Sequence, residues 1–493
     1  MIIGYAQLCA TDVQTWYTGA TAWRRLAERL DDRLAEIDTT TAGLNADWSG
    51  TAADAARVAV ADLRAKTAAC RLPVARTEQV LTEHAGQVAS ARAALAAATT
   101  PEQIERALEL ARRSDQRTAA ALGELMSLAG GAVQGVPAPP SCPPGAGPAA
   151  VRLWWSGLTT AQRNLLIETS PDRIGALDGV PAADRDLANR ELLRREQERL
   201  GALRESLARA EGGGRELERV DRALAGLGVL ADRLAQSSPR PYLLGLDTAG
   251  DGRAIVALGD PDHADNVLTY VPGMNARLDG HLGTSLDRAA AMGEAALQAE
   301  SAKSTSAVLW LGYDTPDSLW EAASSSSAHE AREGLHDFQE GLAATHQGHI
   351  GEQSVVGHSY GALVIGETAR DLGVRADDLV FLGAPGVGVP HAADLHVDPA
   401  TVWAASADND IVGLAAPSVK QFLLDQLWPR YMGEPMADLW HGHNPADEGF
   451  GGHVFEAADN ANPIKAHLGY WDSGNPALTN VGRIAAGQET AIP

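Results

Sequence analysis

The residues with the clearest chemical potential form one short turn, Gly357-His358-Ser359-Tyr360-Gly361. A Gly-x-Ser-x-Gly pattern between a strand and a helix places its serine on a sharp turn that lifts the hydroxyl off the end of the sheet. The apolar run before the turn and the Leu, Val and Ile residues after it are typical of that setting. The two glycines should let strand and helix approach without Cβ clashes. Ser359 is therefore the predicted nucleophile.

A serine hydroxyl is too weak an acid to attack an ester at neutral pH, so it needs a nearby base and a carboxylate that orients that base. In a strand-turn-helix setting the chain order is serine, then acid, then histidine. The acid should come directly after a strand predicted at 401–405, where the chain offers Asp408 and Asp410. The residues alone leave both aspartates open.

The base should be one of the histidines that follow these aspartates, which are His441, His443, His453 and His467. His441 and His443 stand in a polar loop and His453 begins a predicted strand, so we expect surface or strand-edge positions for these three. His467 is predicted to lie in a loop after the last strand. We predict His467 as the base.

Acyl transfer also needs two backbone N–H groups that point at the negative charge developing on the carbonyl oxygen. Tyr360, directly after the nucleophile, should supply one of them. The other should come from Met274 or Asn275, in the loop that leaves a strand at 266–271, and of these we predict Met274. Gly273 would let this loop turn tightly beneath the substrate.

Strands alternate with helices over 241–493, which indicates a mostly parallel sheet covered on both faces. Eight strands with the serine turn after the fifth predict the α/β-hydrolase fold, an α/β class catalytic domain. The predicted strands are 242–247, 254–258, 266–271, 306–311, 354–356, 378–381, 401–405 and 453–455.

An all-α helical-hairpin region is predicted ahead of the sheet, over residues 1–128. Its helices should cover 12–46 and about 51–97, with Pro73 kinking or splitting the second, and a third helix should follow to about 128. Apolar residues recur along the first helix at steps of three and four, which indicates a seam for packing along another helix. That seam includes Trp23, Leu30, Ile37 and Leu44.

Residues 129–149 are rich in Gly and Pro and almost uncharged, so we expect a semi-stiff linker and a domain boundary there. From 150 to 240 the pattern is helical again and leads into the hydrolase domain. Its Arg/Glu-rich run, broken at 212–214, is nearly balanced in charge and predicts a solvated antiparallel helical pair.

Composition excludes several classes of function. A net charge of −24 over 493 residues and a pI near 4.9 argue against binding of nucleic acid or anionic membrane by bulk electrostatics. No apolar run is long enough to predict a membrane span, and the start lacks an ordinary secretory signal, so the localisation is either cytoplasmic or exported without one. The cysteines, Cys9, Cys70 and Cys142, predict neither a zinc site nor a disulfide framework, and we expect no metal and no cofactor.

The segment just ahead of the sheet resembles the one that precedes the catalytic domain in a family of actinobacterial α/β-hydrolases with cutinase and lipase relatives. That family reads roughly Pro-x-x-Ile-Gly-x-Leu-Asp-Gly-x-Pro and then Arg-Asp-x-Ala-Asn. This sequence carries those residues as Pro171, Ile174, Gly175, Leu177, Asp178, Gly179, Pro181, Arg185, Asp186, Ala188 and Asn189.

The same resemblance bears on the acid and the base. The family has Gly-Asp-Pro-Ile after the corresponding strand, which places its aspartate on Asp410 and leaves Asp408 as the alternative acid. The family also carries a histidine followed three residues later by Tyr, as His467 and Tyr470 stand here. The resemblance therefore implies Asp410 and His467 as partners of the serine.

Two long helices joined by Trp48-Ser49-Gly50 resemble the small Trp-x-Gly hairpin proteins exported by the type VII secretion system of actinobacteria. The resemblance implies that the helical region binds a secretion partner. The alternative is a helical hairpin used for docking or for forming a homodimer. No Tyr-x-x-x-Asp/Glu export signal follows the second helix.

We therefore predict a serine hydrolase that acts on a small acyl ester or lipid through an acyl-enzyme. The alternative is a secretion-associated effector or interaction protein whose hydrolase-like domain is inactive.

Overall fold

The computed structural model describes residues 4–130, 137–210, 214–278, 280–412 and 441–492. The chain divides into two compact units, Met1–Pro139 with Thr159–Leu165, and Pro140–Leu158 with Leu166–Pro493. We call them the helical unit and the sheet unit. The predicted boundaries near 128, 149 and 240 remain predictions of domain organisation.

The helical unit contains α1 (Tyr5–Ala10), α2 (Val13–Asp47), α3 (Thr51–Ala69), α4 (Arg71–Ala97) and α5 (Pro101–Gly130). The helix predicted at 51–97 is split into α3 and α4, as Pro73 suggested, because a proline ring clashes with the carbonyl four residues earlier. That carbonyl belongs to Ala69, the last residue of α3.

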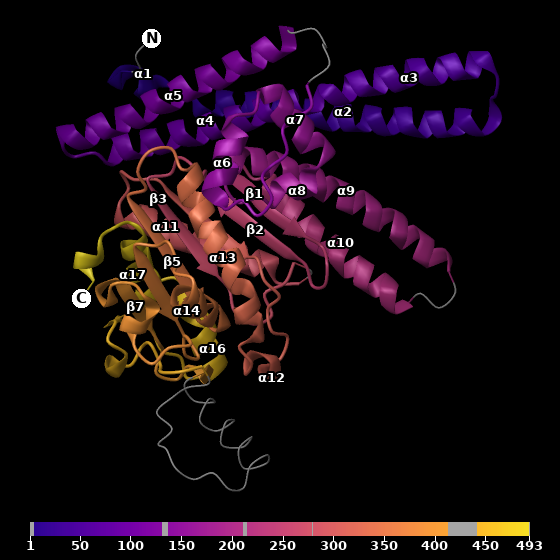
Figure 1. Cartoon of the computed structure of the whole chain (residues 1–493). Helices are drawn as coiled ribbons and strands as arrows, with labels where there is room; N and C mark the ends of the chain where they lie inside the picture. Colours follow the sequence, from indigo (N-terminus) through magenta and orange to yellow (C-terminus); the bar gives the residue numbers. More distant parts are fainter. Residues whose placement is uncertain (1–3, 131–136, 211–213, 279, 413–440, 493) are drawn as a thin grey trace. The chain divides into compact units, whose positions relative to one another are not determined.

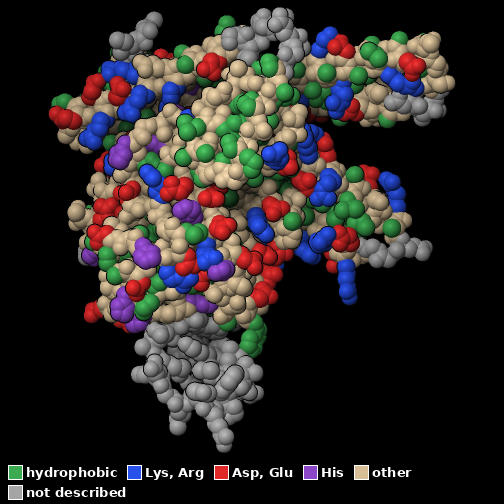
Figure 2. All heavy atoms as spheres, in the orientation of Figure 1, with side chains coloured by type: hydrophobic (Ala, Val, Ile, Leu, Met, Phe, Trp, Pro, Cys, Tyr) green, Lys and Arg blue, Asp and Glu red, His purple; other side chains and the backbone are tan. Residues whose placement is uncertain are grey.

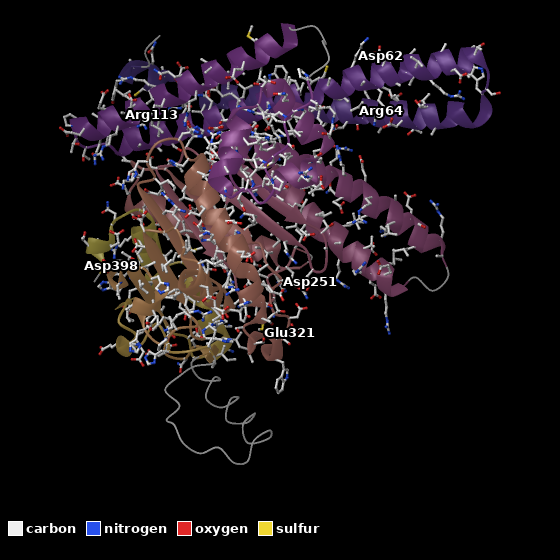
Figure 3. The ribbon with its side chains drawn as sticks, viewed as in Figure 1. Asp62, Arg64, Arg113, Asp251, Glu321 and Asp398 are labelled. Atoms are coloured by element: carbon white, nitrogen blue, oxygen red, sulfur yellow. The ribbon has the colours of Figure 1, made fainter. Side chains whose placement is uncertain are left out.

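The long helix α2 packs along α3 and α4. Arg64 of α3, labelled in Figure 3, donates to both carboxylate oxygens of Asp38 on α2 at 2.5 and 2.8 Å. The predicted seam is only partly covered within the described residues, since Trp23 is 37% exposed. The side chain of Leu44 lies outside the described residues.

The eight predicted strands are confirmed, with small shifts at their ends. They form one sheet in the order β1-β2-β4-β3-β5-β6-β7-β8. The β1–β2 and β2–β4 pairs are antiparallel and all other pairs are parallel. The strands are β1 (Pro241–Asp247), β2 (Arg253–Leu258), β3 (Asn266–Val271), β4 (Thr305–Leu311), β5 (Glu352–His358), β6 (Asp378–Leu382), β7 (Val402–Ala405) and β8 (His453–Val454).

Helices cover both faces of this sheet, as the alternating pattern predicted (Figure 1). One buried apolar cluster joins the sheet to α9 (Ala182–Arg209), α10 (Gly214–Leu234), α11 (Leu282–Ala299) and α17 (Pro476–Ala485). The other joins the opposite face to α13 (Ser326–Thr345) and α14 (Tyr360–Asp371). Both faces of β5 are thereby buried, which holds the strand that carries the serine turn.

Residues 171–189 connect α8 (Pro171–Gly175) and α9 to β1, the strand at one edge of the sheet, through hydrogen bonds. Asn189 Nδ2 on α9 donates to the carbonyls of Gly175 (3.1 Å) and Leu243 (3.0 Å), and Leu243 belongs to β1. The adjacent Asp186 Oδ1 accepts the Leu243 N–H at 2.8 Å. A Cβ at Gly175, in α8, would lie 2.1 Å from Asn189 Oδ1, so only glycine allows this approach.

Three shorter helices are α6 (Pro148–Ser156), α7 (Thr160–Thr169) and α12 (Leu319–Ala322). None of the helices in the described residues is both long and apolar enough to cross a membrane. On the face drawn in Figure 2, acidic and basic side chains are interspersed.

Candidate active site

The serine turn lies at the end of β5. This strand ends at His358 and α14 begins at Tyr360, so Ser359 alone makes the connection. Ser359 has φ 55° and ψ −127°, a strained conformation that costs about 1–3 kcal/mol. Its N–H donates to the carbonyl of Leu382 on β6 at 3.0 Å, which helps to hold the strained turn in place.

The two glycines of the turn have the predicted role. A Cβ on Gly357 would lie 2.7 Å from Cα of Ala362, and one on Gly361 would lie 2.2 Å from the carbonyl oxygen of Val271. Both distances are far below van der Waals contact. Any larger residue would push α14 away from the sheet and displace Ser359.

An aspartate that follows β7 and a histidine that follows β8 lie next to each other. Nδ1 of His467 lies 2.9 Å from Oδ1 of Asp410 and 3.0 Å from Oδ2. Asp410 is 1% exposed, whereas Asp408 is an exposed residue. The structure therefore brings Asp410, and not Asp408, to His467.

His467 was expected in a loop, and that expectation is wrong. The residue lies in a short helix, α16 (Pro463–Leu468). Asn462 caps this helix, because its side-chain oxygen accepts the N–H groups of Ile464 (3.0 Å) and Lys465 (3.2 Å). Proline at the first helical position adds to that start signal, which was present in the sequence.

Tyr470 completes the surroundings of the acid. Its hydroxyl donates to Asp410 Oδ2 at 2.6 Å and accepts the Ala407 N–H at 3.1 Å. Burial by itself would raise the pKa of Asp410, but hydrogen bonds from His467 and Tyr470 outweigh it and hold that pKa below its ordinary value. Burial and the nearby Asp410 carboxylate raise the pKa of Tyr470, which keeps its hydroxyl protonated as a donor.

His358 is a part of the site to which the sequence had assigned no role. Its Nε2 donates to the carbonyl oxygen of His467 at 2.9 Å, so this bond ties the backbone of the base to the serine turn. The two imidazole rings lie 4.6 Å apart. Burial, followed by the charge of His467, lowers the pKa of His358 well below its ordinary value, so its ring is neutral near pH 7.

A cavity of about 580 Å³ opens in front of these residues, and both Ser359 and His467 line it. Met274 and Tyr360 line it as well. A Cβ on Gly273 would lie 2.7 Å from Cβ of Ser359, so glycine alone lets this loop approach the serine. The N–H of Asn275 donates to the carbonyl of Pro316 at 3.1 Å, so this N–H already has an acceptor outside the cavity.

The other histidines that follow the acid have different surroundings and do not line this cavity. His441 Nε2 lies 2.7 Å from the carbonyl oxygen of Ala322. His453 stacks on Trp403 with ring centroids 4.6 Å apart. His443 lies 3.5 Å from Asp447.

One group of carboxylates in the sheet unit could be considered for a metal ion. Glu352, Asp378 and Glu489 have oxygens within 4.8 Å of one another. Burial, and then the charge of Asp378, raise the pKa of Glu352 to about 9, so Glu352 is protonated near pH 7 and can donate to Asp378. Asp378 also accepts from Trp403 Nε1 at 2.6 Å. A proton shared between Glu352 and Asp378 therefore accounts for the short distance between these two carboxyl groups.

Comparisons with known proteins agree with this architecture. Residues 247–420 match the family model described as alpha/beta hydrolase. The uncharacterized protein Rv2079 of Mycobacterium tuberculosis is 30% identical over 389 residues, which cover 71% of this chain and 57% of the relative. This chain thus spans little more than half the length of that relative.

Shorter relatives match over a smaller part of the chain. The uncharacterized proteins Rv0963c of Mycobacterium tuberculosis and Mb0988c of Mycobacterium bovis are both 35% identical over 210 residues, 40% of this chain and 77% of each relative. A solved esterase from the archaeon Pyrobaculum calidifontis aligns with a TM-score of 0.26 and 13% identity, over 60% of this chain and 96% of the esterase. The chain belongs to the same family as these mycobacterial proteins, and its C-terminal region is an alpha/beta hydrolase domain.

Proposed function

We propose that the protein is a serine hydrolase that cleaves carboxylic esters through Ser359, His467 and Asp410. The observation that carries this proposal is that His467, which lines the same cavity as Ser359, is hydrogen-bonded to the buried Asp410. A strained serine and a histidine in one cavity, with a buried carboxylate hydrogen-bonded to that histidine, have the chemistry that acyl transfer requires.

The roles follow from the hydrogen bonds. Asp410 accepts from Nδ1 of His467, which leaves Nε2 as the unprotonated nitrogen that takes the proton from the Ser359 hydroxyl. The serine oxygen then adds to the ester carbonyl, and the resulting imidazolium returns its proton to the departing alcohol. Water, deprotonated by the same nitrogen, next attacks the acyl-serine and releases the acid.

The negative charge that forms on the carbonyl oxygen needs donors that are already in place. Tyr360 is the first residue of α14, so its N–H has no partner within that helix. Met274 lies in the loop that Gly273 brings against the serine. We assign the oxyanion hole to the backbone N–H groups of Tyr360 and Met274.

The walls of the cavity indicate the class of ester. Apolar side chains dominate one side of the cavity, and they include Ile411, Val412, Ile464 and Leu468. Ile464 and Leu468 are 56% and 47% exposed, so apolar surface extends to solvent beside His467. Burial of an alkyl chain there contributes about 0.8 kcal/mol per methylene. An acyl or lipid-like ester is the substrate class that fits.

Labelling with a fluorophosphonate tests the proposal without knowledge of the substrate. Wild-type protein should be labelled, Ser359→Ala should not, and the exposed Ser301→Ala should be labelled like the wild type. Hydrolysis of p-nitrophenyl butyrate should fall by at least about 10³-fold in Ser359→Ala and in His467→Ala. Wild-type protein that resists labelling, or a Ser359→Ala protein with a tenth of the wild-type rate, would rule out this assignment.

A further inference from the structure

One face of helix α11 lines part of the cavity with polar side chains, and we call this face the polar wall. Four lining residues stand at positions i, i+3, i+4 and i+7, where i is the residue that precedes α11. Residues at such spacing share one face of a helix. They are His281, Thr284, Ser285 and Arg288. The lining of the cavity therefore combines these polar residues with apolar ones, which include Ile411, Val412, Ile464 and Leu468.

Arg288 gives this wall a permanent positive charge. A guanidinium stays protonated at any pH relevant to a protein. Among the described residues that line the cavity there is no Asp or Glu, and Arg288 is the one Lys or Arg. This is notable in a chain with a net charge of −24, in which acidic side chains are abundant.

The guanidinium is held in place but is not neutralised by the residues that the structure describes. Its carbon lies 4.3 Å from the ring centroid of Trp471, a cation–π contact. One nitrogen makes a long hydrogen bond of 3.5 Å to the hydroxyl of Tyr270. Described carboxylates form no ion pair with it, so most of its five N–H donors remain for a ligand.

Aromatic contacts connect this cation to the proposed catalytic residues. The ring of Trp471 lies 4.7 Å from that of His358, and His358 lies 4.6 Å from His467. Arg288 also contributes to the lowered pKa of His358, after burial and His467. Arg288 and Ser359 line the same cavity, so one ligand can contact both.

We propose that Arg288 binds an anionic group, a carboxylate or a phosphate, of an ester whose apolar part lies against the apolar residues of the same cavity. This inference rests on the proposed function and specifies its substrate class. The planar guanidinium suits such groups, because it can donate two parallel hydrogen bonds to their oxygens. The apolar surroundings strengthen the attraction relative to water.

Equilibrium binding tests the anion site without catalysis. Octyl phosphate, octanoate and octanol should be titrated calorimetrically into full-length Ser359→Ala protein, so that turnover plays no part. At least one anion should bind about 10- to 100-fold more tightly than octanol, as expected for hydrogen bonds between charged groups. Adding Arg288→Ala should abolish this preference. Adding Arg253→Ala, which removes an exposed arginine of β2 outside the cavity, should preserve it.

Turnover then distinguishes the two anions. Octanoylglycerol phosphate is compared with octanoylglycerol, and octanoylglycolate with octanoylglycolamide, each pair differing in charge. The ratio of kcat/KM for the charged ester to that for the neutral one should fall about 10- to 100-fold in Arg288→Ala, in the phosphate pair or the carboxylate pair. A role of Arg288 in folding alone would lower both members of a pair together, and the ratio would stay constant.

Equal binding of octanol and both anions, or a preference that survives Arg288→Ala, would overturn the inference. Its failure is distinct from failure of the proposed function, which fluorophosphonate labelling decides. Labelled protein without an anion preference would keep the hydrolase and refute the role of Arg288. Unlabelled protein with a preference that depends on Arg288 would refute the esterase and keep the anion site.

Discussion

Nδ1 of His467 lies 2.9 Å from Oδ1 of Asp410, a residue 57 positions earlier in the chain. A second contact of 3.0 Å to Oδ2 holds the imidazole from the same side. Because Nδ1 is engaged, Nε2 is the nitrogen left to exchange protons with a nucleophile. The predictions about the site follow from this pair and from the groups that hold it.

The two aspartates after β7 should differ sharply on substitution. Asp410→Asn should lower kcat/KM for p-nitrophenyl butyrate by about 10³- to 10⁴-fold, because an amide favours the wrong imidazole tautomer. Asp408→Asn is the matched control, since Asp408 is exposed and makes no contact with His467. Its rate should stay within about threefold of wild type. An inactive Asp408→Asn protein beside an active Asp410→Asn protein would reverse the assignment.

Tyr470 should act as a positioning residue for the acid. Tyr470→Phe removes the 2.6 Å donor to Asp410 and leaves the Ala407 N–H without its acceptor. An unsatisfied buried donor costs about 1–3 kcal/mol, so urea unfolding should show a loss of that size. The rate should fall by about tenfold in the wild-type background.

The same substitution in an Asp410→Asn background separates positioning from folding. If Tyr470 acts through Asp410, Tyr470→Phe should have little further effect on kcat there, because the two changes remove one shared interaction. An undiminished tenfold effect in the double variant would show that Tyr470 acts by another route.

The Glu352–Asp378 pair should make stability depend on pH. The pKa of Glu352 is raised from 4.5 to about 9, mainly by burial and then by Asp378, and that of Asp378 is raised from 3.8 to about 6, mainly by burial. The folded protein therefore binds more protons than the unfolded chain above pH 4.5, and its free energy of unfolding should fall as pH rises toward 9. The slope has an upper limit of about 1.4 kcal/mol per pH unit for one proton.

Glu352→Gln should remove the part of that slope that Glu352 contributes, because a glutamine side chain does not titrate. Chemical unfolding at pH 5, 7 and 9 should show that the stability of wild type relative to this variant decreases with pH. Glu294→Gln, an exposed substitution on α11, should follow the wild-type profile. Parallel profiles for wild type and Glu352→Gln would mean that Glu352 has no raised pKa.

Residues 1–128 are predicted to fold independently and to mediate docking or self-association. A truncated chain that begins at Pro140 retains α6 and all eight strands. It should remain soluble, react with fluorophosphonate at Ser359 and hydrolyse ester at close to the full-length rate. Light scattering should give a monomer for it and a dimer for the full chain if the helices self-associate. An insoluble or unreactive truncated chain would make those helices part of the catalytic unit.

Local patterns were sufficient to predict the strands and the turn at Ser359. Strand propensity and turn chemistry depend on near neighbours, so the strands and the turn at Ser359 could be predicted from short stretches. The start of α16 was equally local, at Asn462 and Pro463, but was overlooked. The order in which the strands pair was not predicted, since periodicity carries no information about which strands lie side by side.

The sequence by itself thus determined an alternation of strands and helices, a strained serine turn and a short set of acids and histidines that could serve it. Only the tertiary structure brings one acid and one histidine of this set together, since it buries Asp410 against His467 and leaves Asp408 in solvent. The tertiary structure likewise places Arg288 of α11 over Trp471, in the segment that follows α16. Such choices depend on burial and on distances between residues far apart in the chain, which the folded packing sets and no local pattern encodes.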